Sequence, residues 1–224
     1  MSIGPDIKEA IVEVGTKFII ERDSGDITGG YLNFGSNAQV TKPFIREFFL
    51  EAEFCYDTTI VGGDIVKFNT TGTRYIVMNY TPILFENEII KWEVVLYKTN
   101  EVIQILRSVN ARNLQTYLME VRWEIKETDR PALITSPLYG TDLDTDEELG
   151  LIGLELNEMY IPSAYDYAVH DRIRLSDGDY FRVEAVKKRR YQGVDVVEIG
   201  FDTRATSSST TTTTSSSTTT TTTA

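Results

Sequence analysis

The sequence predicts an all-β protein made of two tandem small antiparallel β-barrel or sandwich modules, with a minor helix and a low-complexity Ser/Thr tail. A strand-rich unit occurs twice, and such repetition decides the fold. The first copy comprises residues 63–68, 72–77 and 92–97, and the second comprises 170–175, 178–183 and 196–201. Every residue from 206 to 223 is serine or threonine. We therefore divide the chain into a first β module (1–100), a second β module (101–204) and a tail (205–224).

Composition sets the limits of the function. The chain has 224 residues, enough for two domains of roughly 100 residues each. Its formal charge of −12 argues against general binding of duplex nucleic acid, which needs concentrated Lys and Arg. An acidic surface does suit a conduit through which DNA slides without being held. The amino terminus lacks the pattern of a signal peptide, and no run has the length of a membrane span. We expect a soluble protein, made in the cytoplasm, that does not bind membranes.

The first half reads as one helix followed by strands and a long loop. Apolar residues recur at helical spacing over 5–14, and Gly15 would end the helix. Residues 17–22 read as a strand, and the glycine-rich segment 23–41 as a long loop. Segment 44–54 has helix-favouring residues, but its alternation favours a strand. The block 62–97 reads as three strands, with turns at 69–72 and 85–88.

The second half repeats this order. Residues 101–107 read as a strand, 109–118 as a helix or an extended connector, and 121–125 as a strand. A second long polar loop is expected at 131–149, followed by a strand at 151–156. The block 169–201 repeats the three strands, with turns at 176–178 and 190–193. The tail is disordered by default in isolation, or docks as an added strand on the sheet edge of a partner.

No pattern in the sequence points to catalysis. The carboxylates that begin at Asp142 resemble the start of a calcium loop, but Glu147 stands where glycine must turn the chain, and Gly153 where the bidentate glutamate belongs. A solvated acidic loop explains them. The lone His170 reads as a surface turn residue in the slot of Gly63, and the lone Cys55 as a buried core residue. We expect no enzyme activity, no catalytic residue, no cofactor and no metal.

Two hairpin tips are the candidate subunit interfaces. A basic run at the last hairpin stands against the acidic background and consists of Lys187, Lys188, Arg189 and Arg190. It could be a solvated turn, a contact with DNA backbone, or a contact with an acidic neighbouring subunit, and in an oligomer of this acidic protein we favour the subunit contact. The corresponding tip in the first unit is apolar and consists of Ile83, Leu84 and Phe85. These side chains either fold onto the core or face a partner, and both readings stay open.

The second unit resembles the carboxy-terminal half of head-closure (stopper) proteins of long-tailed bacteriophages. The resemblance rests on the Asp171-Arg-Ile turn, the Asp177-Gly178 hairpin, Tyr180 and Val183. The first unit repeats these features in degraded form, with Gly63-Asp64, Gly72, Tyr75 and Val77. Such proteins carry one module, so a chain with two modules could take another place in the neck, such as an adaptor or a tail-terminator-like ring.

The resemblance implies a structural protein of the virion neck, the head–tail connector. It would form a homo-oligomeric ring between the portal or adaptor and the tail-terminator or tail-tube proteins, and DNA would pass through its lumen without sequence-specific binding. The loops at 23–41 and 135–149 would contact adjacent rings or gate the lumen. Two alternatives remain: a phage tail or baseplate component, and a carbohydrate-binding module whose Ser/Thr tail is a truncated linker.

Overall fold

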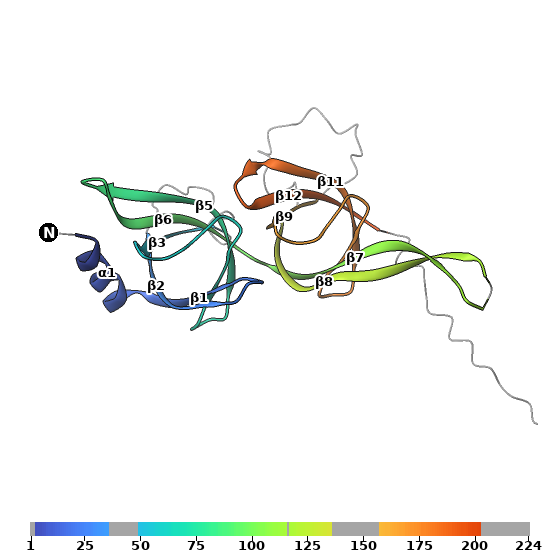
Figure 1. Ribbon diagram of the computed structural model, residues 1–224, viewed down its shortest axis with the longest axis horizontal. Coiled ribbons are helices and arrows are strands. Elements are labelled where there is room, and N and C mark those ends of the chain that lie inside the picture. The colour runs from blue at the N-terminus through green and yellow to red at the C-terminus, as the bar shows by residue number, and fades with distance from the viewer. Residues whose placement is uncertain (1–2, 36–48, 116, 136–156, 203–224) are drawn as a thin grey trace, which may run out of the picture.

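The computed structural model describes residues 3–35, 49–115, 117–135 and 157–202, and it contains two closed antiparallel barrels in tandem (Figure 1). A helix, α1, spans Ile3–Val14. The first barrel is formed by β1 (Thr16–Glu21), β2 (Ile27–Gly35), β3 (Phe49–Cys55), β4 (Ile65–Phe68), β5 (Arg74–Phe85) and β6 (Glu88–Lys98). The second is formed by β7 (Glu101–Arg112), β8 (Met119–Thr135), β9 (Asn157–Pro162), β10 (Arg172–Arg174), β11 (Tyr180–Tyr191) and β12 (Val194–Phe201).

The two barrels have the same strand order. The first runs β1-β2-β3-β6-β5-β4, and the second, read from β7, runs β7-β8-β9-β12-β11-β10. Each strand of the first barrel therefore has a counterpart in the second, in the same sequence order and with the same antiparallel neighbours. The predicted all-β class and the tandem barrels are confirmed. Closure pairs the edge strands that an open sheet would leave exposed.

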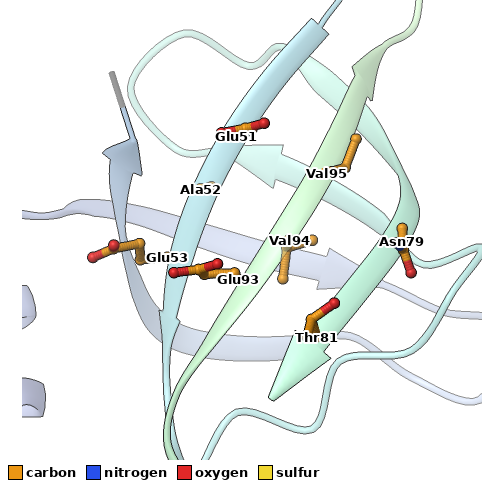
Figure 2. Close-up of a pocket in the computed structure, with 8 residues that line it drawn as sticks. All are labelled: Glu51, Ala52, Glu53, Asn79, Thr81, Glu93, Val94 and Val95. Atoms are coloured by element: carbon orange, nitrogen blue, oxygen red, sulfur yellow. The ribbon is translucent and has the colours of Figure 1, made fainter. Parts of the chain in front are cut away.

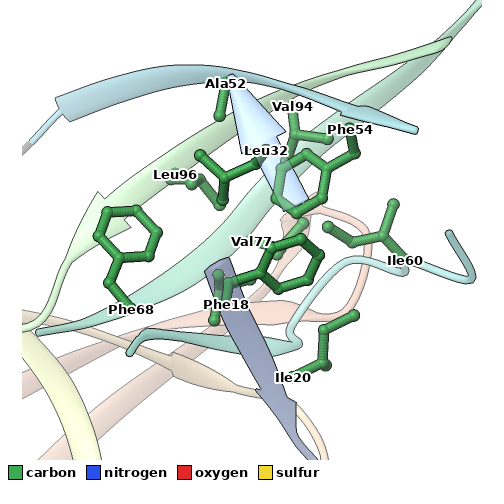
Figure 3. Close-up of a cluster of buried hydrophobic side chains, with 11 residues drawn as sticks. Phe18, Ile20, Leu32, Ala52, Phe54, Ile60, Phe68, Val77, Val94 and Leu96 are labelled. Carbon is green, nitrogen blue, oxygen red and sulfur yellow. The ribbon is translucent and has the colours of Figure 1, made fainter. Parts of the chain in front are cut away.

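The first barrel is filled by side chains that alternate inward along its strands (Figure 3). Phe18 on β1 and Phe54 on β3 meet edge to face, with their ring centroids 4.9 Å apart. The helix α1 packs outside this barrel against β2, β3 and β6. It ends at Gly15, as the sequence predicts, and the Gly15 amide donates to the Ile11 carbonyl at 2.8 Å.

The second barrel has a core of its own. Its fully buried members include Ile103 and Ile105 on β7, Ile161 on β9 and Val183 on β11. The chain passes from the first barrel to the second between β6 and β7, and only Thr99 and Asn100 separate these two strands. The two barrels are therefore joined by a short connection and not by a long linker.

A third apolar cluster lies between the barrels. It joins Ile65, Ile76 and Met78 of the first barrel to Leu133 and Val194 of the second. At its margin the rings of Tyr97 and Tyr160 lie 5.8 Å apart, and Arg130 of the second barrel donates to Asp23 of the first at 2.7 Å. The burial of these residues couples the barrels to each other.

Glycine backbones also meet across this boundary. Gly193, in the turn between β11 and β12, has a φ of 79° and lies against Gly62 and Gly63 of the first barrel. A Cβ built on Gly193 would overlap the carbonyl oxygen of Gly62, and a Cβ built on Gly62 would overlap the carbonyl oxygen of Gln192 in that turn. Only residues without a side chain allow the backbones to approach so closely.

Three of the predicted segments differ in whole or in part from the structure. Much of the expected loop 23–41 is strand β2, because Gly30 is not a loop marker but a position where a Cβ would overlap the Phe18 ring. Strand β7 continues through Arg112, so of the two alternatives for 109–118 the helix does not form and the extended one holds as far as Arg112. Strand β8 continues to Thr135, so the second expected loop begins later than Pro131. Residues 44–48, the acidic run from Asp142, the predicted strand 151–156 and the Ser/Thr tail lie outside the described residues.

Candidate interaction surfaces

An aspartate turn is built in the same way in both barrels. Asp64 precedes β4, and its carboxylate accepts from Arg22 Nε at 2.6 Å and from the Val61 amide at 2.9 Å. Asp171 precedes β10 and accepts from Arg107 Nε at 3.1 Å and from the Ala168 amide at 2.8 Å. Both aspartate residues are buried. The turn on which the resemblance rests therefore has one geometry, present twice.

The residue before each aspartate adopts a positive φ, which is 85° at Gly63 and 76° at His170. In both turns this residue and the aspartate exchange backbone hydrogen bonds with a single valine, which is Val77 of β5 in the first barrel and Val183 of β11 in the second. His170 is exposed, and its Nδ1 lies 2.8 Å from Arg182 Nη2. The histidine thus occupies the turn position expected from its alignment with Gly63.

These aspartates act as structural groups. Hydrogen bonds from Arg107 to Asp171 and to Asp166 raise the pKa of the guanidinium, and Asp64 raises the pKa of Arg22 in the same way. The arginines therefore stay charged at every accessible pH. An arginine–aspartate pair that also holds a backbone amide fixes the chain at the start of β4 and β10.

Of the four side chains in the basic run, the structure describes only that of Lys187. Lys187 lies on β11, and its Nζ lies 3.3 Å from Glu158 Oε1 and also pairs with Glu198. The side chains of Lys188, Arg189 and Arg190 lie outside the described residues. The turn that follows the run contains Gly193, which packs on the first barrel of the same chain. Sequence reasoning did not anticipate this position beside the barrel boundary, and the predicted subunit contact stays a prediction.

The apolar tip lies at the other end of the first barrel. Leu84 is 59% exposed and Phe85 44% exposed, whereas Ile83 is half-buried. Glu86 and Asn87, with φ values of 48° and 66°, form the tight turn between β5 and β6. Figure 1 shows this tip and the basic-run hairpin on different parts of the molecule, so the structure does not bring the two predicted surfaces together.

Sequence reasoning missed an exposed apolar feature of the second barrel. Strands β7 and β8 extend beyond the second barrel as a long hairpin (Figure 1). We name its outer part, residues 108–126, the distal hairpin. Its exposed apolar side chains are Leu114, Tyr117, Leu118, Met119, Val121 and Ile125. The alternation over 119–126 could have revealed the ribbon, had 109–118 not been read as a separate helix or connector.

A shallow hollow lies on the outer face of the first barrel (Figure 2). Its volume is about 240 Å³, and it lies over β3, β5 and β6. Glu51, Glu53 and Glu93 line it together with Asn79 and Thr81. Lys91 Nζ lies 2.6 Å from Glu53 and 3.5 Å from Glu93, and so offsets part of their charge. The hollow is acidic and has no aromatic ring among its lining residues.

The remaining reactive groups are tied into the core. Burial raises the pKa of the Cys55 thiol, which lies 3.7 Å from the Tyr31 carbonyl oxygen. Tyr167 donates its hydroxyl proton to the buried Asp195, and burial raises the pKa of this tyrosine. In the described ranges, no group of three or more His, Cys, Asp and Glu side chains is placed to hold a metal ion. Nor does any helix there have the length and apolar character that a membrane crossing requires.

Comparison with protein-family models, with curated proteins and with solved structures finds no match.

Proposed function

We propose that this chain is a structural subunit of the neck of a tailed bacteriophage, the head–tail connector that closes the DNA channel. The observation that carries the proposal is the aspartate turn of the resemblance, which is built with the same contacts at Asp64 and at Asp171. Two such barrels fused in one chain offer surfaces to neighbouring subunits. The subunit would form a ring between the portal or adaptor and the tail-terminator or tail-tube proteins.

Charge supports the proposed passage of DNA. The chain carries a net charge of −12, and an acidic lumen repels the phosphate backbone. Duplex DNA would therefore slide through such a ring without being held. The described surface charges serve mostly for pairing within the chain, as Lys187 and Arg107 do.

The hollow bears on the carbohydrate-binding alternative. Sugar rings stack on exposed aromatic faces, and the residues that line the hollow supply carboxylates, an amide, a hydroxyl and aliphatic groups instead. The tail or baseplate alternative uses the same architecture and differs only in where the subunit sits.

The location of the chain in particles tests the proposal. An epitope placed after Ala224 would be labelled with gold-conjugated antibody and imaged in tailed particles of the phage that encodes the chain. The proposal predicts label at the junction of head and tail. Label at the tail tip would favour the baseplate alternative, and unlabelled particles would contradict a virion role.

A further inference from the structure

The distal hairpin is a ribbon of two strands with unpaired edges. Strand β10 pairs with β7 only at residues 104–106, and β9 pairs with β8 only at 133–135. Among the described residues, the outer parts of β7 and β8 pair only with each other. A two-stranded ribbon is marginally stable alone in water. Its two free edges are also templates for pairing with another chain.

The ribbon has one apolar face. Successive side chains of a strand point to opposite faces, so Met119, Val121, Trp123 and Ile125 share one face of β8. The Arg172 guanidinium carbon lies 3.9 Å from the centre of the Trp123 ring. This stacking holds the base of the ribbon against the barrel. Farther out, Val121 is 63% exposed and Met119 is 67% exposed. An apolar strip of this kind marks an interaction site.

The opposite end of the molecule offers a second apolar surface. We name α1 together with residues 84–89 the acceptor end, and Figure 1 shows it at the far end of the long axis from the distal hairpin. Leu84 and Phe85 are exposed there, as are Val12 and Val14 on the helix. Each copy of the chain therefore carries one apolar surface at each end.

The two ends differ in charge. The distal hairpin carries three cations against two carboxylates. Arg122 pairs with Glu120 at 3.8 Å and Lys126 with Glu124 at 3.3 Å, so Arg112 supplies the one excess positive charge. Helix α1 carries three carboxylates, Asp6, Glu9 and Glu13, against one cation, Lys8, which is already paired with Asp57 at 2.5 Å. A cationic segment in a chain of strongly negative net charge is best matched by an acidic surface, because opposite charges set orientation and speed association.

We propose that the distal hairpin of one copy docks on the acceptor end of the next copy. The contact joins two different surfaces at opposite ends of the subunit, so it is heterologous, and repetition of one heterologous contact produces a ring when the rotation closes. This inference deepens the proposed function, because it assigns the contact between ring subunits. It commits to a second copy of this chain as the occupant of the ribbon.

Complementary variants test the contact. The hairpin variant carries Val121→Asp and Ile125→Asp, and the acceptor variant carries Leu84→Asp and Phe85→Asp. All four positions are exposed, so each variant should keep the circular dichroism spectrum and melting temperature of the wild type. Val169→Asp is the matched control, because Val169 is also exposed but lies in neither surface. Light scattering coupled to size exclusion measures the mass of each protein alone and of the two variants mixed in equal amounts.

The proposal expects the wild type and the control to assemble. Each double variant should be monomeric, with its dissociation constant raised at least about tenfold. The mixture should form a one-to-one pair, because the acceptor variant keeps an intact hairpin and the hairpin variant keeps an intact acceptor end. Gradual addition of salt should weaken the pair.

Three results would overturn the proposal. An acceptor variant that assembles like the wild type would show that hairpins meet each other or another surface. Two monomeric variants that fail to pair when mixed would exclude the heterologous contact. A wild type that stays monomeric at all concentrations would exclude docking of a second copy. The particle-labelling experiment remains independent of all three, so a neck protein with a different contact would still be recognised.

Discussion

The close approach of backbones at Gly193 yields the sharpest prediction on stability. The change is Gly193→Ala, and its matched control is Gly178→Ala in the neighbouring hairpin. Both glycines have a positive φ, 79° at Gly193 and 96° at Gly178, so alanine is strained at either position by about 1 kcal/mol. A Cβ on Gly178 meets nothing within 4 Å, whereas one on Gly193 overlaps the Gly62 carbonyl oxygen of the first barrel.

The overlap sets the size of the difference. Forcing extra atoms into a packed site costs about 1–3 kcal/mol. We therefore expect Gly178→Ala to lower the free energy of unfolding by about 1 kcal/mol, and Gly193→Ala to lower it by about 2–4 kcal/mol. The added loss should appear as weaker coupling of the barrels, because the overlap is relieved when they move apart and expose Ile76 and Leu133.

The two tryptophans allow the barrels to be followed separately. Trp92 lies on β6 of the first barrel and Trp123 on β8 of the second. In urea titrations of single-tryptophan variants, the unfolding midpoints reported by Trp92 and Trp123 should coincide when residue 193 is glycine. The two midpoints should differ when residue 193 is alanine. Equal losses from the two glycine substitutions, with coincident midpoints in both, would refute the packing argument.

Three further predictions concern single groups. Asp64→Ala and Asp171→Ala should each lower the free energy of unfolding in urea by about 3 kcal/mol, because a half-buried arginine and a backbone amide lose their acceptor. The control Asp57→Ala, which removes the exposed pair with Lys8, should leave the free energy of unfolding unchanged within error. Burial raises the pKa of Tyr165 above its ordinary 10.0, so the unfolded chain ionises first and stability falls as pH rises above that value. Tyr165→Phe should therefore flatten the fall in melting temperature above about pH 10. Cys55 should react with a thiol reagent only at the rate of unfolding, and rapid labelling of the native protein would contradict its burial.

The strands that sequence reasoning found share a local signature. The predicted segments 72–77 and 178–183 each place an aromatic and β-branched run after Gly72 or Gly178, and they form the starts of β5 and β11. Turn chemistry of this kind acts over a few residues. The duplication was also visible, since Asp64 and Asp171 stand at matching places in the two units. These are local patterns that need no knowledge of distant contacts.

The strands that sequence reasoning missed depend on distant contacts. Glycines within 27–35 look like loop residues until Phe18 is known to lie over Gly30. Asn157–Pro162 has few residues that favour strands, and it becomes β9 because it pairs with β8 and β12. The contact of Gly193 with Gly62 and Gly63 joins residues far apart in the chain, so no local pattern announces it.

The candidate surfaces also depend on contacts that local sequence patterns do not reveal. Exposure of Leu84 and Phe85 could not be decided from sequence, since an apolar hairpin tip either folds back or projects. The distal hairpin was missed because 109–118 favours no one structure by itself. Its strand character comes from pairing with 119–126 in the antiparallel register that joins Asn110 to Val121.

Electron microscopy of the purified full-length chain tests the central claim most directly. Two directly joined barrels with complementary surfaces at opposite ends should assemble into closed rings, so class averages should show one cyclic symmetry. Fields of single subunits or of open filaments, at concentrations well above those used for light scattering, would contradict the claim that this chain is a ring subunit.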